Sequence, residues 1–240
     1  MKALITGGQQ GIGFGIAQVL HGAGWEIALA ADVPDAPEAL AALPGATYHQ
    51  HDVTDIGAAA ALLDKVGPIH TFVSNAGVGA LQRGDLLDMT PESFDRCMNV
   101  NLRGAVFLAQ EVARRMLDMP TEPYRSMVFI TSVSAAIVNV DRAEYCMSKA
   151  AAAMSAQAFA LRLAPHGIGV FDVRPGIIST PLTAPVATRY DAAIPQLVPA
   201  GRWGYPDDIA RIVLPLARGE FAFATGAQIP VDGALSINRF

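Results

Sequence analysis

The chain has 240 residues, a length that suits one sizeable α/β domain. Just over half of the residues are apolar (52%) and only 16% are charged, so a large core can form and disorder is disfavoured. The net charge is -5 and no run of Lys or Arg occurs, which argues against nucleic acid or an anionic membrane surface as a partner.

The two cysteines, Cys97 and Cys146, form no CxxC pair and have no His cluster beside them. We therefore expect reduced thiols in a cytoplasmic protein, with neither a disulfide frame nor a metal site. The apolar run that ends at Thr6 is too short for a signal peptide. No uninterrupted apolar stretch reaches the roughly 18 residues that a transmembrane helix needs, so no membrane span is expected.

Short apolar runs alternate with longer helical patterns along almost the whole chain. Strands are expected at 2–6, 26–31, 46–50, 69–74, 126–132, 168–173 and 227–231. Helices are expected at 12–23, 36–42, 55–65, 92–118, 144–164 and 207–218. This alternation is typical of right-handed βαβ units, so we predict one domain, 1–240, with a doubly wound parallel sheet covered on both faces.

One connection, residues 176–206, departs from the alternation. It is rich in proline and also carries aliphatic and aromatic side chains, among them Ile178, Leu182, Tyr190 and Trp203. A long connection inside a compact domain is usually functional. We interpret this segment as a substrate lid that packs when it closes.

The first strand leads directly into Thr6-Gly7-Gly8-Gln9-Gln10-Gly11-Ile12-Gly13. Glycine allows a tight turn in which backbone N–H groups approach a pyrophosphate, and the positive end of the following helix favours that anion. The spacing Thr-Gly-x-x-x-Gly-x-Gly resembles the short-chain dehydrogenase/reductase family more than the G-x-G-x-x-G of other dinucleotide enzymes. By that resemblance, Gly7, Gly11, Ile12 and Gly13 line the cofactor.

The second strand runs into Asp32. An acidic residue about twenty positions after the glycines accepts both ribose hydroxyls of NAD and repels the 2′-phosphate of NADP. No Arg or Lys follows closely, and Gln10 stands where NADP-using relatives often carry a base. The sequence therefore predicts NAD, with an ordinary helix-capping role for Asp32 as the alternative.

Two further strand ends match the family. The resemblance assigns Asp52 to the adenine ring, with Val53 beside it; the alternative is an N-cap formed by Asp52 or Thr54. The run Ser74-Asn75-Ala76-Gly77 resembles the family's Asn-Ala-Gly. There Asn75 braces the sheet, and Ala76 and Gly77 leave room for the adenosine ribose.

Tyr145 and Lys149 stand four positions apart and so share one face of a helix. A free Tyr is a poor base at neutral pH. An ammonium about 4 Å away contributes roughly 4 kcal/mol at an effective dielectric near 20. That energy is expected to lower the Tyr145 pKa by up to about three pH units, toward the range that general acid–base catalysis requires.

The surroundings of this pair also match the family. Ser132 follows a strand thirteen residues before Tyr145 and can hydrogen-bond the substrate oxygen; Ser134 is the nearby alternative. Asn101 lies in a long helical pattern, where Asn is locally unfavourable. The resemblance makes Asn101 the residue that interrupts the helix and holds a water linked to the lysine, with Asn99 as the alternative.

The last motif, Arg174-Pro175-Gly176-Ile177-Ile178-Ser179-Thr180, resembles the family's Pro-Gly loop. The resemblance implies that Pro175, Gly176 and Ile178 line the cofactor and that Thr180 binds the nicotinamide amide. Together these motifs predict the catalytic set Asn101, Ser132, Tyr145 and Lys149.

The predicted function is hydride transfer between NAD and a secondary alcohol or ketone, such as a sugar, a polyol or a small hydroxy compound. Arg142 and Arg189 are open candidates for binding substrate hydroxyls or a carboxylate. A 3-oxoacyl-acyl-carrier-protein reductase is the first alternative, although NADPH and a basic docking patch would be expected of it. A non-catalytic nucleotide sensor or scaffold is the second, although it would need no Tyr145 or Lys149.

The two longest helical patterns carry apolar residues on more than one face, including Val106, Leu108, Met154 and Phe159. Helices that are apolar all round are buried. In the family, the extra face forms a subunit interface, so the resemblance implies a homotetramer.

Overall fold

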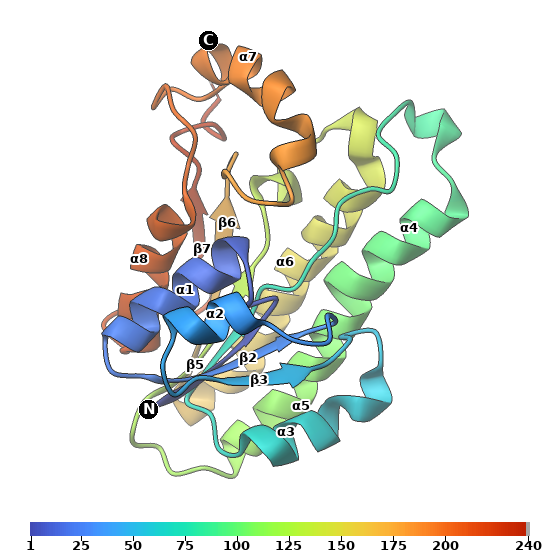
Figure 1. Ribbon diagram of the computed structural model, residues 1–240. Helices are drawn as coiled ribbons and strands as arrows, with labels where there is room; N and C mark the ends of the chain where they lie inside the picture. The colour runs from blue at the N-terminus through green and yellow to red at the C-terminus, as the bar shows by residue number, and fades with distance from the viewer. Residues whose placement is uncertain (239–240) are drawn as a thin grey trace.

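Seven short segments of the chain pair side by side into one sheet (Figure 1). The computed structural model describes residues 1–238. The strands are β1 (Lys2–Thr6), β2 (Glu26–Ala31), β3 (Thr47–Gln50), β4 (Thr71–Ser74), β5 (Arg125–Ile130), β6 (Ile168–Pro175) and β7 (Gln228–Val231). Their order is β3-β2-β1-β4-β5-β6-β7, and every neighbouring pair is parallel. The predicted fold class, a doubly wound parallel sheet of the Rossmann type, is thus confirmed.

Helices cover both faces of this sheet. They are α1 (Gly11–Gly22), α2 (Pro37–Ala42), α3 (Ala59–Val66), α4 (Pro91–Met98), α5 (Ala105–Leu117), α6 (Ala143–Leu163), α7 (Ala187–Leu197) and α8 (Pro206–Ala217). Helices α1, α2 and α8 lie over one face, and α3, α5 and α6 over the other (Figure 1).

Alternation along the strands explains the two layers. On β1, Ile5 packs into the core beneath α1 and α8, whereas its neighbour Leu4 packs into the core beneath α5 and α6. Successive strand side chains point to opposite faces, and a parallel sheet with both faces covered is apolar on both. Residues Ile16 and Leu20 give α1 a buried stripe with helical spacing.

The sheet order reverses beside β1, which pairs with β2 on one side and β4 on the other. In such a sheet the connections leave in opposite directions at this point, and a crevice opens at the carboxyl ends of the strands. The glycine turn after β1 and the Asn75 loop after β4 both lie at this edge.

Two predicted elements need correction. The single helix expected at 92–118 is divided: a π-helical turn, Asn99–Gly104, separates α4 from α5. No helix was assigned to the predicted lid at 176–206, but α7 occupies Ala187–Leu197. No helix was predicted there because the segment contains several prolines, which disfavour helices. Pro195 lies inside α7, near its end, where the missing N–H removes a single backbone hydrogen bond.

The Thr6 hydroxyl joins the glycine turn to the loop after β4, and its removal should weaken the whole edge. Its side chain is buried, and its oxygen accepts from the backbone N–H groups of Asn75 and Ala76 at 3.0 Å each. Thr6→Val leaves both donors without an acceptor and should lower the free energy of unfolding by about 2 kcal/mol. Urea titration measures this. Thr6→Ser keeps the hydroxyl, so its free energy of unfolding should fall much less. Equal stability of the Thr6→Val and Thr6→Ser variants would contradict this role of the hydroxyl.

Candidate active site

The predicted site residues meet at the carboxyl edge of the sheet. The glycine turn follows β1, Asn75 follows β4, Ser132 follows β5, and Gly176 follows β6. Helix α6 crosses beside this edge and brings Tyr145 and Lys149 to it. Residues that are far apart in sequence are therefore gathered where a parallel sheet binds its ligands.

The glycine turn has the backbone of a phosphate cradle. Gly7 and Gly11 have φ values of +63° and +55°, the left-handed region that glycine adopts without strain. A Cβ on Gly13 would lie 2.4 Å from the carbonyl oxygen of Gly7, so a side chain there would force the turn apart. The first turn of α1 has no acidic residue, and its N-cap, Gln10, makes no side-chain capping bond. Its backbone N–H groups are thus oriented for an anion.

The surroundings of the turn fit a dinucleotide. Gln9 Oε1 is buried and has no hydrogen-bond partner among the described residues, an acceptor that a ligand donor would satisfy. A Cβ on Gly11 would contact Thr180 at 3.4 Å, so the Pro-Gly loop lies against the turn. Asp32 stands exposed just beyond β2, and within residues 1–238 no cation pairs with its carboxylate.

Asn75 ties two strand ends together, as expected. Its Nδ2 donates to the carbonyl oxygens of Thr6 and Gly7 at 2.9 and 3.1 Å. Gly77 is needed for space, because a Cβ there would lie 3.1 Å from Asn101 Oδ1 and 3.4 Å from Lys149 Nζ. This small-residue loop therefore lies directly against two residues of the predicted catalytic set.

Asp52 closes a local turn after β3. Its Oδ1 accepts from the backbone N–H and the hydroxyl of Thr54, at 2.8 Å each. The cap of the helical turn that follows is Asp55, which accepts from the Ala58 N–H at 3.2 Å. The alternative that Asp52 or Thr54 caps this helix is therefore wrong. Val53 is buried, and its carbonyl oxygen packs against Gly104 of the π-helical turn.

Asn101 lies in the π-helical turn and is fully engaged there. Its Nδ2 donates to the Val78 carbonyl and to Ser148 Oγ at 2.9 Å each, and its Oδ1 accepts from the Val78 N–H at 2.7 Å. The irregular helix agrees with the expected interruption. The side chain fixes the loop after β4 against α6, and a water held by Asn101 stays a prediction.

Lys149 is a buried cation. Its Nζ donates to the Ile130 carbonyl at the end of β5, at 3.1 Å, and lies 5.9 Å from the centroid of the Tyr145 ring. Burial lowers the Lys149 pKa to about 8, against the opposing influence of Asp172. Asp172 is buried on β6, where it accepts from the Thr131 hydroxyl and from Arg174 Nε.

The expected lowering of the Tyr145 pKa by Lys149 is wrong for the free protein. Burial raises this pKa, and the opposing influences come first from the Arg142 charge and then from a hydrogen bond with Ser132. The reason is geometric. The lysine ammonium bonds to a backbone carbonyl, whereas the Arg142 Cζ lies 4.8 Å from the Tyr145 ring centroid.

The two candidate serines have different hydrogen-bond partners. Ser132 makes a hydrogen bond with Tyr145, and its Oγ also accepts from the Ser134 N–H at 3.0 Å. Ser134 Oγ instead accepts from Arg142 Nη2 at 3.1 Å. Ser132 is thus the serine beside the Tyr145 hydroxyl.

The Pro-Gly loop is held by a residue that the sequence analysis missed. Thr183 Oγ1 accepts from the Thr180 N–H at 3.0 Å and donates to the Ile178 carbonyl at 2.7 Å. The loop thereby folds back over the glycine turn. The only sequence signal is a second Thr three positions after Thr180, which is too common to be diagnostic.

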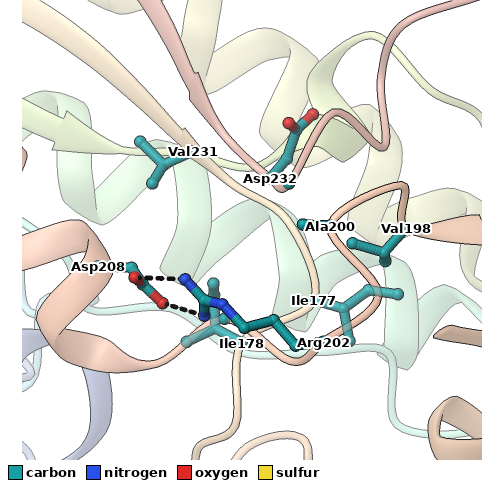
Figure 2. Close-up of a pocket in the computed structure, with 10 residues that line it drawn as sticks. Ile177, Ile178, Val198, Ala200, Arg202, Asp208, Val231 and Asp232 are labelled. Carbon is teal, nitrogen blue, oxygen red and sulfur yellow. Dashed lines mark hydrogen bonds and ion pairs between the residues drawn. The ribbon is translucent and has the colours of Figure 1, made fainter. Parts of the chain in front are cut away.

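A pocket lies beside this loop, lined by Ile177, Ile178, Val198, Ala200, Arg202, Gly204, Asp208, Val231, Asp232 and Gly233 (Figure 2). Arg202 and Asp208 form a two-pronged ion pair within it, at 2.8 and 2.9 Å. Both charges are therefore already compensated, and none of the predicted catalytic residues lines this pocket.

Two negative findings apply to residues 1–238. No group of three or more His, Cys, Asp or Glu side chains is arranged to hold a metal ion. No helix in this range combines the length and the apolar character needed to cross a bilayer. Cys97 and Cys146 are both free and buried.

Comparison with known proteins gives matches over nearly the whole chain. A family model described as enoyl-(acyl carrier protein) reductase matches residues 7–236. The 3-oxoacyl-(acyl-carrier-protein) reductase MabA of Mycobacterium tuberculosis (strain ATCC 25618 / H37Rv) is 34% identical over 99% of this chain and 94% of that protein. L-Xylulose reductase of Bos taurus is 30% identical over 97% of this chain and 95% of its own.

Among solved structures, the 3-oxoacyl-(acyl-carrier protein) reductase from Brucella melitensis in complex with NAD superposes with a TM-score of 0.94. It is 45% identical, and the match covers 100% of this chain and 98% of that one. These relatives are short-chain oxidoreductases that act on hydroxyl or keto groups.

Burial of Lys149 should make stability depend on pH in a defined direction. Below about pH 8 the folded protein buries a charged ammonium, which costs stability. Between about pH 8 and the ordinary lysine value of 10.5, the unfolded chain binds a proton that the folded chain has released. The free energy of unfolding should therefore rise across this range, relative to Lys149→Met, by about 3 kcal/mol at most. Denaturant titrations of both proteins at several pH values measure it; a constant difference would contradict the burial.

Proposed function

The chain belongs to the short-chain dehydrogenase/reductase family, and on that premise we propose that it transfers a hydride between NAD and a secondary alcohol or ketone. The observation that carries the proposal is the contact of Tyr145 with Ser132, beside Lys149 and at the same edge as the glycine turn. The proposed substrate is a sugar, a polyol or another small hydroxy compound.

In this proposal the two hydroxyls of Ser132 and Tyr145 bind the oxygen of the substrate. Tyr145 donates its proton to that oxygen when a ketone is reduced, and accepts one when an alcohol is oxidised. Burial keeps Tyr145 protonated in the free protein, so it is ready to act as the acid of the reduction. When bound, the dinucleotide supplies or accepts the hydride at its nicotinamide ring.

Lys149 and Asn101 serve the same centre. Lys149 holds a positive charge next to the Tyr145 ring and is fixed by the Ile130 carbonyl. Asn101 fixes Ser148, one residue before Lys149, and the loop at Val78. We assign Lys149 to the nicotinamide ribose and to proton exchange with Tyr145, and Asn101 to the proton path beyond it.

NAD is proposed over NADP because of Asp32. Its exposed carboxylate stands at the end of β2, where the ribose of the adenosine half would lie, and it would repel a 2′-phosphate. The Brucella melitensis relative, 45% identical, was solved with NAD. The glycine turn, Asp52 and Val53, the Asn75-Ala76-Gly77 run and the Pro-Gly loop supply the remaining proposed cofactor contacts.

A 3-oxoacyl-carrier-protein reductase remains the second candidate, because both MabA and the Brucella melitensis relative carry that name. Against it stands the net charge of -5, which would repel an acidic carrier. Asp32 does not separate the two candidates, because the Brucella melitensis relative of that name was solved with NAD. An acyl-CoA thioester therefore belongs in the test of the proposed function.

A homotetramer in the cytoplasm is the proposed state of the protein. Large apolar side chains stand exposed on α5 and α6, including Phe107, Met154 and Leu161, and Phe223 is fully exposed before β7. A subunit interface that covers these side chains would remove their apolar surface from water.

The proposed function is tested by an absorbance assay with NADH and NADPH against neutral ketones, ketoses, oxo acids and acetoacetyl-CoA, and with NAD against the corresponding alcohols. NADH should be oxidised with at least one small ketone or oxo acid and preferred over NADPH. Tyr145→Phe should lower kcat by about 100- to 10 000-fold, because the proton donor is lost.

NADH binding, followed by its fluorescence, should stay within a few-fold of the wild-type value in Tyr145→Phe. Near-normal turnover by this variant would contradict the assignment of Tyr145 as the proton donor. Turnover of the CoA thioester alone, with NADPH, would favour the second candidate instead.

A further inference from the structure

Arg142 occupies a position that the mechanism described so far does not use. It is the last residue of a helical turn, Val140–Arg142, and the N-cap of α6, three residues before Tyr145. Its guanidinium carbon lies 4.8 Å from the centroid of the Tyr145 ring. The side chain is only partly exposed. A fixed positive charge therefore stands against the ring of the proposed proton donor.

Part of this guanidinium is without a partner. Arg142 Nη2 donates to Ser134 Oγ at 3.1 Å, which fixes its orientation. Arg142 Nε is buried, and nothing in residues 1–238 accepts a hydrogen bond from it. A buried donor on a charged group is costly when it stays unsatisfied.

Neighbouring carboxylates do not compensate the charge. Asp141 pairs with Arg189 at 2.5 Å, and Glu144 accepts from the Ser93 hydroxyl at 2.5 Å. The N-cap position adds to the imbalance, because the positive end of α6 disfavours a cation and favours an anion. Arg142 is thus a partly buried cation without a compensating charge, at a position where an anion would be stabilised.

The other candidate arginine differs in this respect. Arg189 on α7 is largely exposed, and its charge is compensated by the ion pair with Asp141. Arg174, which also lies near the end of β6, is paired with the buried Asp172 at 2.7 Å. Of these three arginines, Arg142 alone has no carboxylate partner within the described chain.

We propose that Arg142 binds a carboxylate of the substrate and so makes the protein selective for small hydroxy and oxo acids. The inference rests on the proposed function, since it assigns the substrate class of the same site. An acid whose carboxylate stands a few bonds from its carbonyl can place that carbonyl at Ser132 and Tyr145 and the carboxylate at Arg142. A planar guanidinium matches a carboxylate with two parallel hydrogen bonds.

The test compares each oxo acid with its own neutral ester. The pairs are 2-oxobutanoate, acetoacetate and levulinate against their methyl esters, assayed with NADH. Wild type should prefer at least one acid over its ester. In Arg142→Gln the acid-to-ester ratio of kcat/KM should fall by about 10- to 100-fold, as expected for charge-assisted hydrogen bonds. Arg142→Lys keeps the positive charge but lacks the planar guanidinium, so its acid-to-ester ratio should fall less than that of Arg142→Gln.

The double variant Asp141→Asn with Arg189→Gln is the matched control, because it removes the neighbouring ion pair without leaving a carboxylate beside Arg142, and its acid-to-ester ratio should equal that of wild type. If wild type reduces the esters at least as well as the acids, the inference fails and the proposed function stands. An equal loss on acid and ester in Arg142→Gln also overturns it, since Arg142 would then only position Tyr145. If neither these pairs nor the wider panel of ketones and alcohols reacts, the proposed function itself fails.

Discussion

Burial of the Lys149 ammonium is the constraint on which the rest of the site depends. The cation is held by one backbone carbonyl, that of Ile130, and therefore by the end of β5. For this carbonyl to be available, β5 must end where it does and α6 must cross at that point. A Cβ on Gly77 would lie 3.4 Å from the ammonium and, more tightly, 3.1 Å from Asn101 Oδ1, so the loop after β4 has little room for a side chain there. The buried charge and Asn101 together thus constrain a strand end, a helix and a loop.

The same burial governs the electrostatics of Tyr145. A low-dielectric site disfavours every charged form, so it lowers the Lys149 pKa to about 8 and raises that of Tyr145. Of the cations in residues 1–238, Arg142 lies nearer to the Tyr145 ring than Lys149 does, and it is not one of the four predicted catalytic residues. A proton donor that stays neutral suits ketone reduction. The proposed oxo-acid specificity places a substrate charge beside this donor, where it offsets that of Arg142.

Much of this arrangement could be predicted from local sequence. Short apolar runs between helical patterns predicted the strands, because strands of a parallel sheet that is buried on both faces are apolar along their whole length. The glycine turn and the pairing of Tyr145 with Lys149 were visible from spacing alone. Helix α7 was not, because prolines obscured its pattern. The pKa direction of Tyr145 also escaped prediction, since burial depends on elements that pack together only in the folded chain.

Partners of particular side chains were equally hidden. The thirteen-residue interval favoured Ser132 over Ser134, but the hydrogen bond from Arg142 to Ser134 could not be predicted from the sequence. The same holds for Arg142 and Arg189, which differ in whether a carboxylate lies within reach. Such differences arise from contacts between segments that are distant in sequence, so a local sequence motif cannot predict them.

The most direct measurement is a pH titration of Tyr145 in the free protein, followed as the difference in phenolate absorbance between wild type and Tyr145→Phe. The account predicts a transition above the ordinary tyrosine value of 10.0, because burial outweighs the nearby cations. A transition near neutral pH would contradict it, and would show instead that Lys149 controls the ionisation of Tyr145 before any cofactor binds.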